Sequence, residues 1–334
     1  MLYFKSLTKS YDTKKKGKKM VEIKNLVKKY GTKYALDDIS FTIDDGEIVG
    51  FLGPNGAGKS TTMNIVTGYL ASTSGTVVID GKDVFEDPIE AKKLIGYLPE
   101  QPPLYMDMTV QEYLEFVFEL KSCTLNKKKH IDEICVITKI DSVRDRLIKN
   151  LSKGFRQRVG IAQAIMGNPK IIIFDEPTVG LDPKQIIEVR NLIRNLGKTH
   201  TVILSTHILS EVQSVCNRII VINNGKIVAD EKTENLTKTI TENARYRVKV
   251  AGPQREVAQA LRNVPGVLMV DALNERDADA FVYIIESAGN VDIRKKLFRT
   301  LADRDWPMLG LEAVGADLED IFIKLTDKKK KGDK

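Results

Sequence analysis

The periodicity of apolar residues divides the chain into segments of different character. In residues 21–98, apolar and polar residues alternate between Gly or Asp turns, which indicates strands, and a helix is expected from Lys59 to Tyr69. Residues 106–150 carry apolar residues at helical spacing, and the aromatic positions of YLEFVFEL are interpreted as core. Residues 157–230 are expected to alternate between helices and strands, and their continuous apolar runs are typical of parallel strands covered on both faces. The pattern predicts an α/β domain with an inserted helical segment.

A second pattern follows a polar, Thr- and Lys-rich stretch. From about residue 244 the expected order is strand, helix, strand, strand, helix, strand, which is typical of a ferredoxin-like unit. The segment DLEDIFIKL is then expected to form a closing helix. The predicted parts are an α/β domain at 20–235 with a helical subdomain at about 102–160, a linker at 236–243, and a small α+β ferredoxin-like domain at 244–326.

Charge is concentrated at the two ends of the 334-residue chain. The net charge is +7, but residues 1–19 hold seven Lys and one Asp, and residues 327–334 hold five Lys and two Asp. The body between them is therefore slightly acidic, which argues against a broad nucleic-acid-binding surface. Both ends are predicted to be disordered, because like charges in a run repel one another. Weak attraction of these lysines to an anionic membrane surface is the alternative.

The rest of the composition indicates the cellular compartment in which the chain is expected. No run of 18 apolar residues occurs and the N-terminus lacks a signal-peptide core, so a cytoplasmic chain is expected. Three cysteines without zinc spacing make a disulfide framework or metal cluster an unfavoured interpretation. His130 and His200 belong to no motif and are expected at the surface.

One glycine-rich segment carries phosphate chemistry. It follows the apolar strand EIVGFL, precedes a helix and matches GxxxxGK(S/T), which is the context that a P-loop requires. Backbone N–H groups of such a loop cradle phosphate oxygens, the lysine adds charge between the β- and γ-phosphates, and the Ser hydroxyl binds Mg²⁺. A chance glycine-rich turn is the alternative. The expected ATP-binding residues here are Gly53, Pro54, Asn55, Gly56, Ala57, Gly58, Lys59, Ser60 and Thr61.

A pair of acids follows the apolar run at residues 171–174. Asp175 and Glu176 come where a buried strand ends, and ligand sites of parallel sheets lie at that edge. Asp175 is expected to hold Mg²⁺, and Glu176 is expected to polarise the attacking water near the γ-phosphate. A strand that simply ends in a polar turn is the alternative, and the upstream P-loop disfavours it.

The segment LSKGFRQ resembles the signature of the ABC ATPase family, LSGGQ. The resemblance, which covers about residues 20–235, implies that Leu151, Ser152, Lys153 and Gly154 face the γ-phosphate bound by a partner subunit. Lys153 and Phe155 depart from LSGGQ, although LSKGxRQR is a variant that transporter ATPases show. An ordinary helix N-cap by Ser152 is the alternative, and capping and phosphate binding use the same geometry.

Four further residues match family features in the expected order. Tyr30 matches the aromatic residue that stacks on adenine, with Tyr34 as a rival. Gln101 matches the glutamine that senses Mg²⁺ and the γ-phosphate. His207 matches the switch histidine, and Asp182 matches the acid that crosses the dimer seam. Tyr30, Gln101 and His207 could each instead be a structural residue of a strand end or loop.

The resemblance also implies cofactors and partners. It implies that two ATP-binding chains, identical or homologous, close on two ATP molecules with Mg²⁺ held by Ser60, Gln101 and Asp175, and that Glu176, His207 and Gln101 serve catalysis. The single ATPase copy and the C-terminal unit resemble ABC-2-type exporter ATPases of multidrug, sodium-export and gliding-motility-associated systems. Such a subunit drives separate integral membrane permease subunits at the inner face of the cell membrane. A soluble ABC ATPase that acts on ribosomes or nucleic acid is the alternative.

Overall fold

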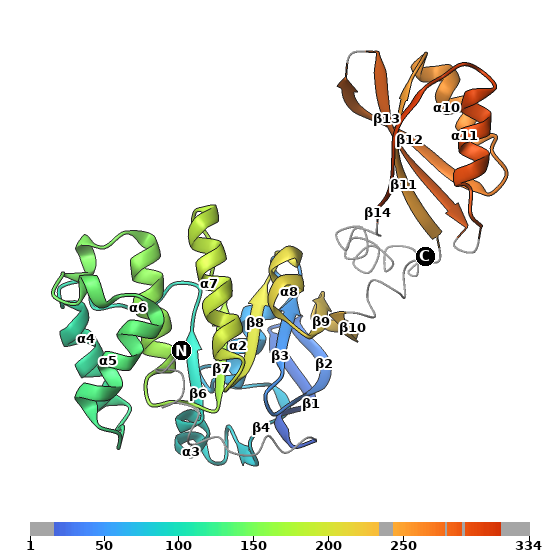
Figure 1. Ribbon diagram of the computed structural model, residues 1–334. Helices are drawn as coiled ribbons and strands as arrows, with labels where there is room; N and C mark the ends of the chain where they lie inside the picture. The colour runs from blue at the N-terminus through green and yellow to red at the C-terminus, as the bar shows by residue number, and fades with distance from the viewer. Residues whose placement is uncertain (1–16, 234–242, 278, 289–290, 315–334) are drawn as a thin grey trace. The chain divides into compact units, whose positions relative to one another are not determined.

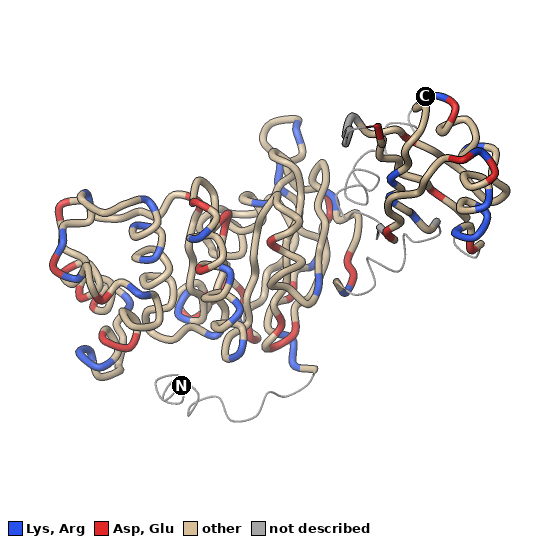
Figure 2. Tube along the Cα trace, turned by 45° about the horizontal axis from the view of Figure 1, so that its top comes forward, with Lys and Arg blue, Asp and Glu red and all other residues tan. Residues whose placement is uncertain are grey.

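The chain divides into two compact units, Met1–Thr233 and Glu234–Lys334, each with its own hydrophobic core (Figure 1). Basic and acidic residues are interspersed along the trace of both units (Figure 2). No helix among the described residues is both long and apolar enough to cross a membrane. The computed structural model describes residues 17–233, 243–277, 279–288 and 291–314.

A six-stranded sheet forms the centre of the first unit. Its order is β10-β9-β3-β8-β7-β6, and all neighbours are parallel except the β9–β10 pair. Every residue of β3, β7 and β8 is buried, as their continuous apolar sequences predict for strands covered on both faces. The strands are β3 (Ile48–Leu52), β6 (Ile95–Leu98), β7 (Ile171–Asp175), β8 (Thr201–Thr206), β9 (Arg218–Asn223) and β10 (Lys226–Lys232).

An antiparallel sheet covers one face of the central sheet. Its order is β2-β1-β4-β5, and its apolar residues pack on those of β3, with the rings of Phe41 and Phe51 5.5 Å apart between centroids. On the opposite face, Gly50 lets α8 approach β3 closely, because an added Cβ would lie 2.2 Å from Cγ1 of Val212. The strands are β1 (Lys19–Tyr30), β2 (Lys33–Asp44), β4 (Ser74–Ile79) and β5 (Lys82–Asp83).

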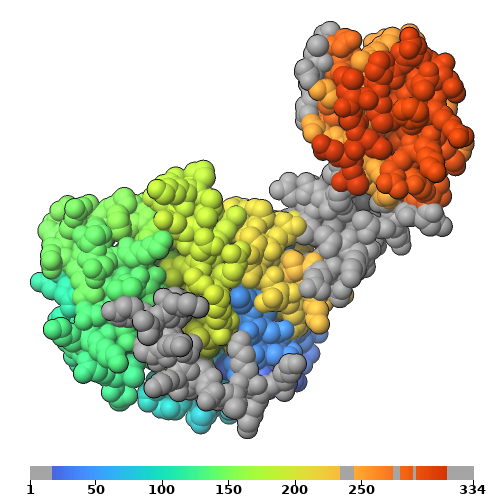
Figure 3. All heavy atoms as spheres, in the orientation of Figure 1, coloured from blue at the N-terminus to red at the C-terminus, as the bar shows by residue number. Residues whose placement is uncertain are grey.

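Helices occupy the rest of this unit. Between β6 and β7 the described chain is helical, and these residues gather at one end of the unit (Figure 3). Helix α4 begins at a capping box in which Thr109 accepts from the N–H of Glu112. The helices are α2 (Lys59–Val66), α3 (Pro88–Lys93), α4 (Val110–Leu120), α5 (Lys127–Thr138), η1 (Asp141–Val143), η2 (Ile148–Asn150), α6 (Lys153–Ile165), α7 (Pro183–Leu196) and α8 (Leu209–Val215).

The second unit has the predicted ferredoxin-like order. Its sheet is β12-β13-β11-β14 with antiparallel neighbours, and Val248 and Tyr283 lie in a core with Leu261 and Leu297 of its two helices. The fold class expected from the sequence is thus confirmed in both units. The helix expected over DLEDIFIKL lies outside the described residues. The elements are β11 (Asn243–Ala251), α10 (Gln254–Arg262), β12 (Val267–Asp277), β13 (Ala280–Ala288), α11 (Arg294–Ala302) and β14 (Met308–Val314).

Three local expectations were wrong. Helix α2 ends at Val66 rather than Tyr69, because Gly68 turns the chain with φ +68°. His130 and His200, expected at the surface, are only 4% and 3% exposed. Nε2 of His130 accepts from the N–H of Gly167 after α6, and Nδ1 of His200 lies 3.1 Å from the carbonyl oxygen of Leu196, the last residue of α7. Both imidazoles satisfy backbone groups at helix ends, and burial lowers the pKa of each below its ordinary value.

Candidate functional site

The glycine-rich loop between β3 and α2 is wrapped tightly round the start of the helix. Gly58 has φ +112°, and a Cβ at this residue would lie 2.8 Å from the carbonyl oxygen of Ala35. A side chain is therefore excluded by both conformation and space. Helix α2 starts directly after Gly58, so its unpaired N–H groups and positive dipole end face the loop. The loop is built to surround an anion.

Lys59 brings a positive charge to the centre of the loop. Its side chain is only 6% exposed, and Nζ donates to the carbonyl oxygens of Gly53 at 2.8 Å and Pro54 at 3.3 Å. Nζ also lies 3.5 Å from Oε1 of Glu176. The ammonium is thus held by oxygens of its own loop and by a carboxylate from the facing strand end.

Two acids lie at the end of β7, as the sequence predicts: Asp175 is its last residue and Glu176 follows it, and they have different environments. Asp175 is buried and accepts from Oγ of Ser205 at 2.7 Å. Burial raises the pKa of Asp175, while hydrogen bonds from Ser205 and Ser60 act in the opposite direction. Ser60 and Asp175 therefore bring a hydroxyl and a carboxylate together, and such hard oxygen donors suit Mg²⁺.

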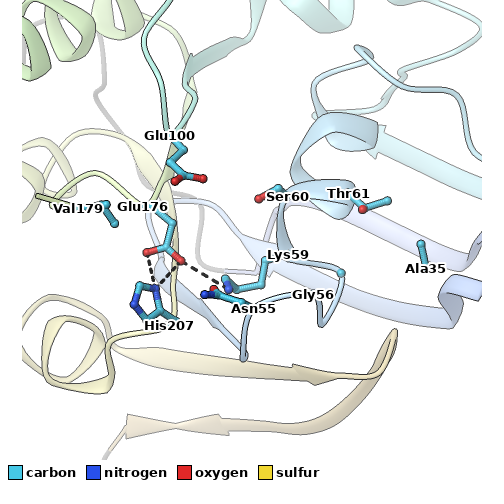
Figure 4. Close-up of a pocket in the computed structure, with 11 residues that line it drawn as sticks. Ala35, Asn55, Gly56, Lys59, Ser60, Thr61, Glu100, Glu176, Val179 and His207 are labelled. Atoms are coloured by element: carbon cyan, nitrogen blue, oxygen red, sulfur yellow. Dashed lines mark hydrogen bonds and ion pairs between the residues drawn. The ribbon is translucent and has the colours of Figure 1, made fainter.

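Glu176 has an unusual backbone for its residue type. Its φ is +49°, and its N–H donates to the carbonyl oxygen of Ser205 at 2.8 Å. Its carboxylate lies 2.9 and 3.0 Å from Nδ1 of His207 (Figure 4). A non-glycine residue in this left-handed region is strained and persists only where the surrounding structure holds it. Such residues are enriched at functional sites.

Lys59, Glu176 and His207 line one cavity of about 410 Å³ at the carboxyl ends of the central strands, which we call the P-loop cavity (Figure 4). The structure brings together eight residues that the sequence predicted: Asn55, Gly56, Gly58, Lys59, Ser60, Thr61, Glu176 and His207. Sequence reasoning missed Ala35, Glu100 and Val179 as lining residues. Glu100 and Val179 each lie within three residues of a motif, and that proximity was the available signal.

Six residues expected at this site do not line the cavity: Tyr30, Gly53, Pro54, Ala57, Gln101 and Asp175. Tyr30 stands at the end of β1, 55% exposed, with Nζ of Lys28 5.2 Å from its ring centroid. Gln101 lines a neighbouring cavity of about 580 Å³ together with Lys153 and Arg156. Glu100, one residue earlier, lines both cavities.

The signature segment lies apart from the P-loop cavity of its own chain. Ser152 caps α6 by accepting from the N–H of Phe155 at 3.4 Å, which is the capping geometry expected from the sequence. Asp182 caps α7 by accepting from the N–H of Gln185 at 2.9 Å. Neither Ser152 nor Asp182 lines the cavity that holds Lys59. Within one chain, the loop and the signature serve different surfaces.

Comparisons with known proteins agree with this geometry. The family model described as ABC transporter matches residues 36–179. An uncharacterized ABC transporter ATP-binding protein of Bacillus subtilis is 34% identical over 88% of this chain and 97% of its own. The bacitracin transport ATP-binding protein of Bacillus licheniformis is 32% identical over 92% of this chain and 97% of its own. The solved structure of an ATP-binding cassette, a dimer in a post-hydrolysis state with ADP and Pi, matches with TM-score 0.59 and 31% identity over 64% of this chain and 99% of that one.

Proposed function

Since this chain belongs to the family of ABC transporter ATP-binding proteins, and is an ATPase motor subunit, we propose specific roles for its residues and partners. The loop at residues 53–61 binds the phosphates of ATP, and Glu176 is the catalytic base. The observation that carries this proposal is the convergence of Lys59, Glu176 and His207 on one cavity at the start of α2.

The hydrolytic step follows from this arrangement. The phosphate oxygens of ATP replace the loop carbonyls and Glu176 as partners of Lys59. Glu176 accepts a proton from a water whose oxygen attacks the γ-phosphorus, and the bond to the bridging oxygen of ADP breaks. His207 holds the carboxylate of Glu176 and contacts the γ-phosphate. ADP and inorganic phosphate are the products.

Mg²⁺ fits the oxygen donors beside the loop. Ser60 and Asp175 would hold it, and Gln101 would approach it from the neighbouring cavity. When bound, Mg²⁺ neutralises charge on the phosphate oxygens. The hydroxyl of Ser205 keeps Asp175 oriented for this role.

The complete site belongs to two chains. The signature segment at the start of α6 completes the ATP site of a partner subunit through Ser152 and Gly154, which Leu151 and Lys153 flank. Asp182, the cap of α7, also reaches the partner's site. This proposal is supported by the placement of Ser152 outside its own P-loop cavity and by the dimeric solved relative. ATP then acts as the bridge between two subunits, and adenine stacks on Tyr30.

The motor drives separate membrane subunits, in the direction of export. Relatives named for bacitracin transport and linearmycin resistance match more than nine-tenths of this chain, which favours an exporter over the ribosome- or nucleic-acid-acting alternative. The subunit then works at the inner face of the cell membrane through a permease. The ferredoxin-like domain at 244–326 is proposed to support the dimer.

One substitution tests the central proposal. Glu176→Gln keeps shape but removes the base, so it should bind ATP, fail to hydrolyse it and accumulate as an ATP-bound dimer in light scattering. Glu188→Gln, a carboxylate of α7 beside Arg158, is the matched control and should hydrolyse ATP normally. A Glu176→Gln protein that stays monomeric with ATP and hydrolyses at the wild-type rate would refute the assignment.

A further inference from the structure

We propose that Glu211 is a positioning residue that orients the catalytic Glu176 and the following loop through two threonine hydroxyls. The proposal rests on the role assigned to Glu176 above. Glu211 lies on α8 and is 1% exposed, outside the P-loop cavity. It belongs to no motif that the sequence predicted.

Three separate elements converge on the carboxylate of Glu211. Thr178, in the loop after β7, donates its hydroxyl to Oε1. Thr206, the last residue of β8, donates to Oε2 at 3.0 Å. Nη2 of Arg190 on α7 lies 3.7 Å from Oε1. A single buried side chain therefore links the end of one strand, the loop after another and a helix.

Burial of such a carboxylate is unfavourable if its side chain only fills space in the core. Desolvation of a buried charge is costly, and apolar replacements of buried ion pairs are often neutral or stabilising. A buried acid with two hydroxyl donors and one arginine contact, from three elements, fixes geometry more than it adds stability. The position of Glu211 therefore calls for a geometric role at the neighbouring site.

Thr206 connects Glu211 to the catalytic residue. Its Oγ1 lies 3.2 Å from Oε2 of Glu176 and 3.0 Å from Oε2 of Glu211. A hydroxyl has one proton, so Thr206 donates to one carboxylate at a time. Glu211 keeps its contacts with Thr178 and Arg190 when the proton of Thr206 turns to Glu176, so the hydroxyl can be shared between the two carboxylates.

Glu176 needs this support because its backbone is strained. A non-glycine residue at φ +49° lies in a disfavoured backbone region, so its placement depends on the contacts that hold it. His207 holds the carboxylate from one side and Thr206 from the other. Thr206 is itself fixed by the N–H of Ile208, which its oxygen accepts at 3.1 Å.

Thr178 connects Glu211 to the loop that runs toward the dimer seam. The loop starts at Pro177, whose carbonyl accepts from Nε2 of Gln157 at 2.8 Å, and ends at Asp182, the cap of α7. Val179, the residue after Thr178, lines the P-loop cavity. Glu211 therefore places the catalytic carboxylate and the loop that carries Asp182 in one fixed relation.

Steady-state kinetics distinguish a positioning role of Glu211 from a contribution to folding stability alone. Neither Thr206 nor Glu211 lines the cavity, so Thr206→Val and Glu211→Gln should leave KM for ATP within about twofold of wild type. Both should lower kcat at least about tenfold, because a misplaced base loses most of its effect. Combined, the two changes should cost no more than the larger single effect, since both act on Glu176 through one path.

The control removes a comparable hydroxyl elsewhere. Thr138 is buried and donates to the carbonyl oxygen of Ile134 within α5, far along the chain from this network. Thr138→Val should lower the melting temperature without changing kcat. Wild-type kcat in Thr206→Val and Glu211→Gln, or fully additive losses in their combination, would overturn the proposal. If Glu176→Gln still traps the dimer in that case, only the role of Glu211 falls.

The contact between Thr178 and Glu211 is tested in the Glu176→Gln protein, which is expected to accumulate as the ATP-bound dimer. Thr178→Val added to Glu176→Gln should raise the ATP concentration needed for half-maximal dimer in light scattering by about threefold or more. Thr206→Val in the same background should not, because it acts on residue 176 rather than on the loop. If both double variants needed the same ATP concentration for half-maximal dimer, the proposed role of the contact between Thr178 and Glu211 would be contradicted.

Discussion

Nζ of Lys59 lies 3.5 Å from Oε1 of Glu176, and the lysine also donates to two carbonyl oxygens of its own loop. Both side chains are less than a tenth exposed. The charge that would meet a phosphate is therefore compensated by the residue that would activate water. In the proposed function, the phosphate oxygens of ATP would replace these partners, which would couple nucleotide binding to the release of Glu176.

Loss of the Lys59 ammonium should abolish most of the affinity for nucleotide. Lys59→Ala removes a desolvated charge, and we expect at least about tenfold weaker binding of MgATP, or roughly 1.4 kcal/mol. Titration with a fluorescent ATP analogue measures the effect. Lys226→Ala, which removes an exposed lysine paired with Asp37, is the control and should bind normally. Unchanged affinity of Lys59→Ala would contradict the phosphate site.

Mixed dimers should recover activity that neither variant has alone. Ser152→Ala retains Glu176, and Glu176→Gln retains Ser152, so a mixed dimer contains one intact site. With random pairing about half of the dimers are mixed, and we expect about a quarter of the wild-type rate. Hydrolysis of ATP by the 1:1 mixture measures this directly. A mixture as inactive as its components would show that Ser152 does not serve the opposite chain.

Acid should destabilise the protein through His130. Its folded pKa is lowered, so its contribution is complete above the ordinary value of about 6.5 and is lost as pH falls below that value toward the folded pKa. Protonation would also break the bond that Nε2 accepts from Gly167. The expected loss is at most about 1.4 kcal/mol per pH unit.

Urea unfolding at pH 7.5 and 5.5 tests this expectation. His130→Gln should be less stable at pH 7.5 but should lose less free energy of unfolding between the two pH values. Thr138→Val, which has no titratable group, should keep the wild-type pH dependence. Identical pH dependence in His130→Gln and wild type would rule out His130 as the source.

Two glycines in left-handed conformations should respond differently to alanine. Gly81 has φ +81° and open space, so Gly81→Ala should cost about 1–2 kcal/mol of stability and leave ATP affinity unchanged. Gly58→Ala adds a contact of 2.8 Å with a backbone oxygen and should weaken ATP binding about tenfold or more. Calorimetric titration of both variants measures the contrast. Equal affinities would mean that the loop tolerates displacement.

Local patterns carried most of the fold. Continuous apolar runs at residues 171–174 and 202–204 predicted buried parallel strands because a strand covered on both faces has no polar side. The βαββαβ order of the second unit followed from changes of period between strand and helix. The end of α2 could not be located to the residue, because Gly68 rather than the apolar pattern terminates the helix.

The burial of single polar residues could not be predicted from their neighbours in the sequence. Nothing in the neighbouring sequence distinguishes His130 from a surface histidine, because its partner Gly167 is 37 residues away. Glu211 is a similar case, since Thr178 lies 33 residues before it. Such residues are identified only by the partners that the fold brings to them.

The sequence by itself determined the chemistry of the site. A P-loop, two acids after an apolar strand and a histidine after the next one are local patterns whose residue types and order predict phosphate binding and water activation. Only the tertiary structure decided how these groups meet. Strands β3, β7 and β8 are neighbours in the central sheet although far apart in the chain, so their ends place Lys59, Glu176 and His207 together. That adjacency depends on long-range pairing of backbone groups, which no local pattern encodes.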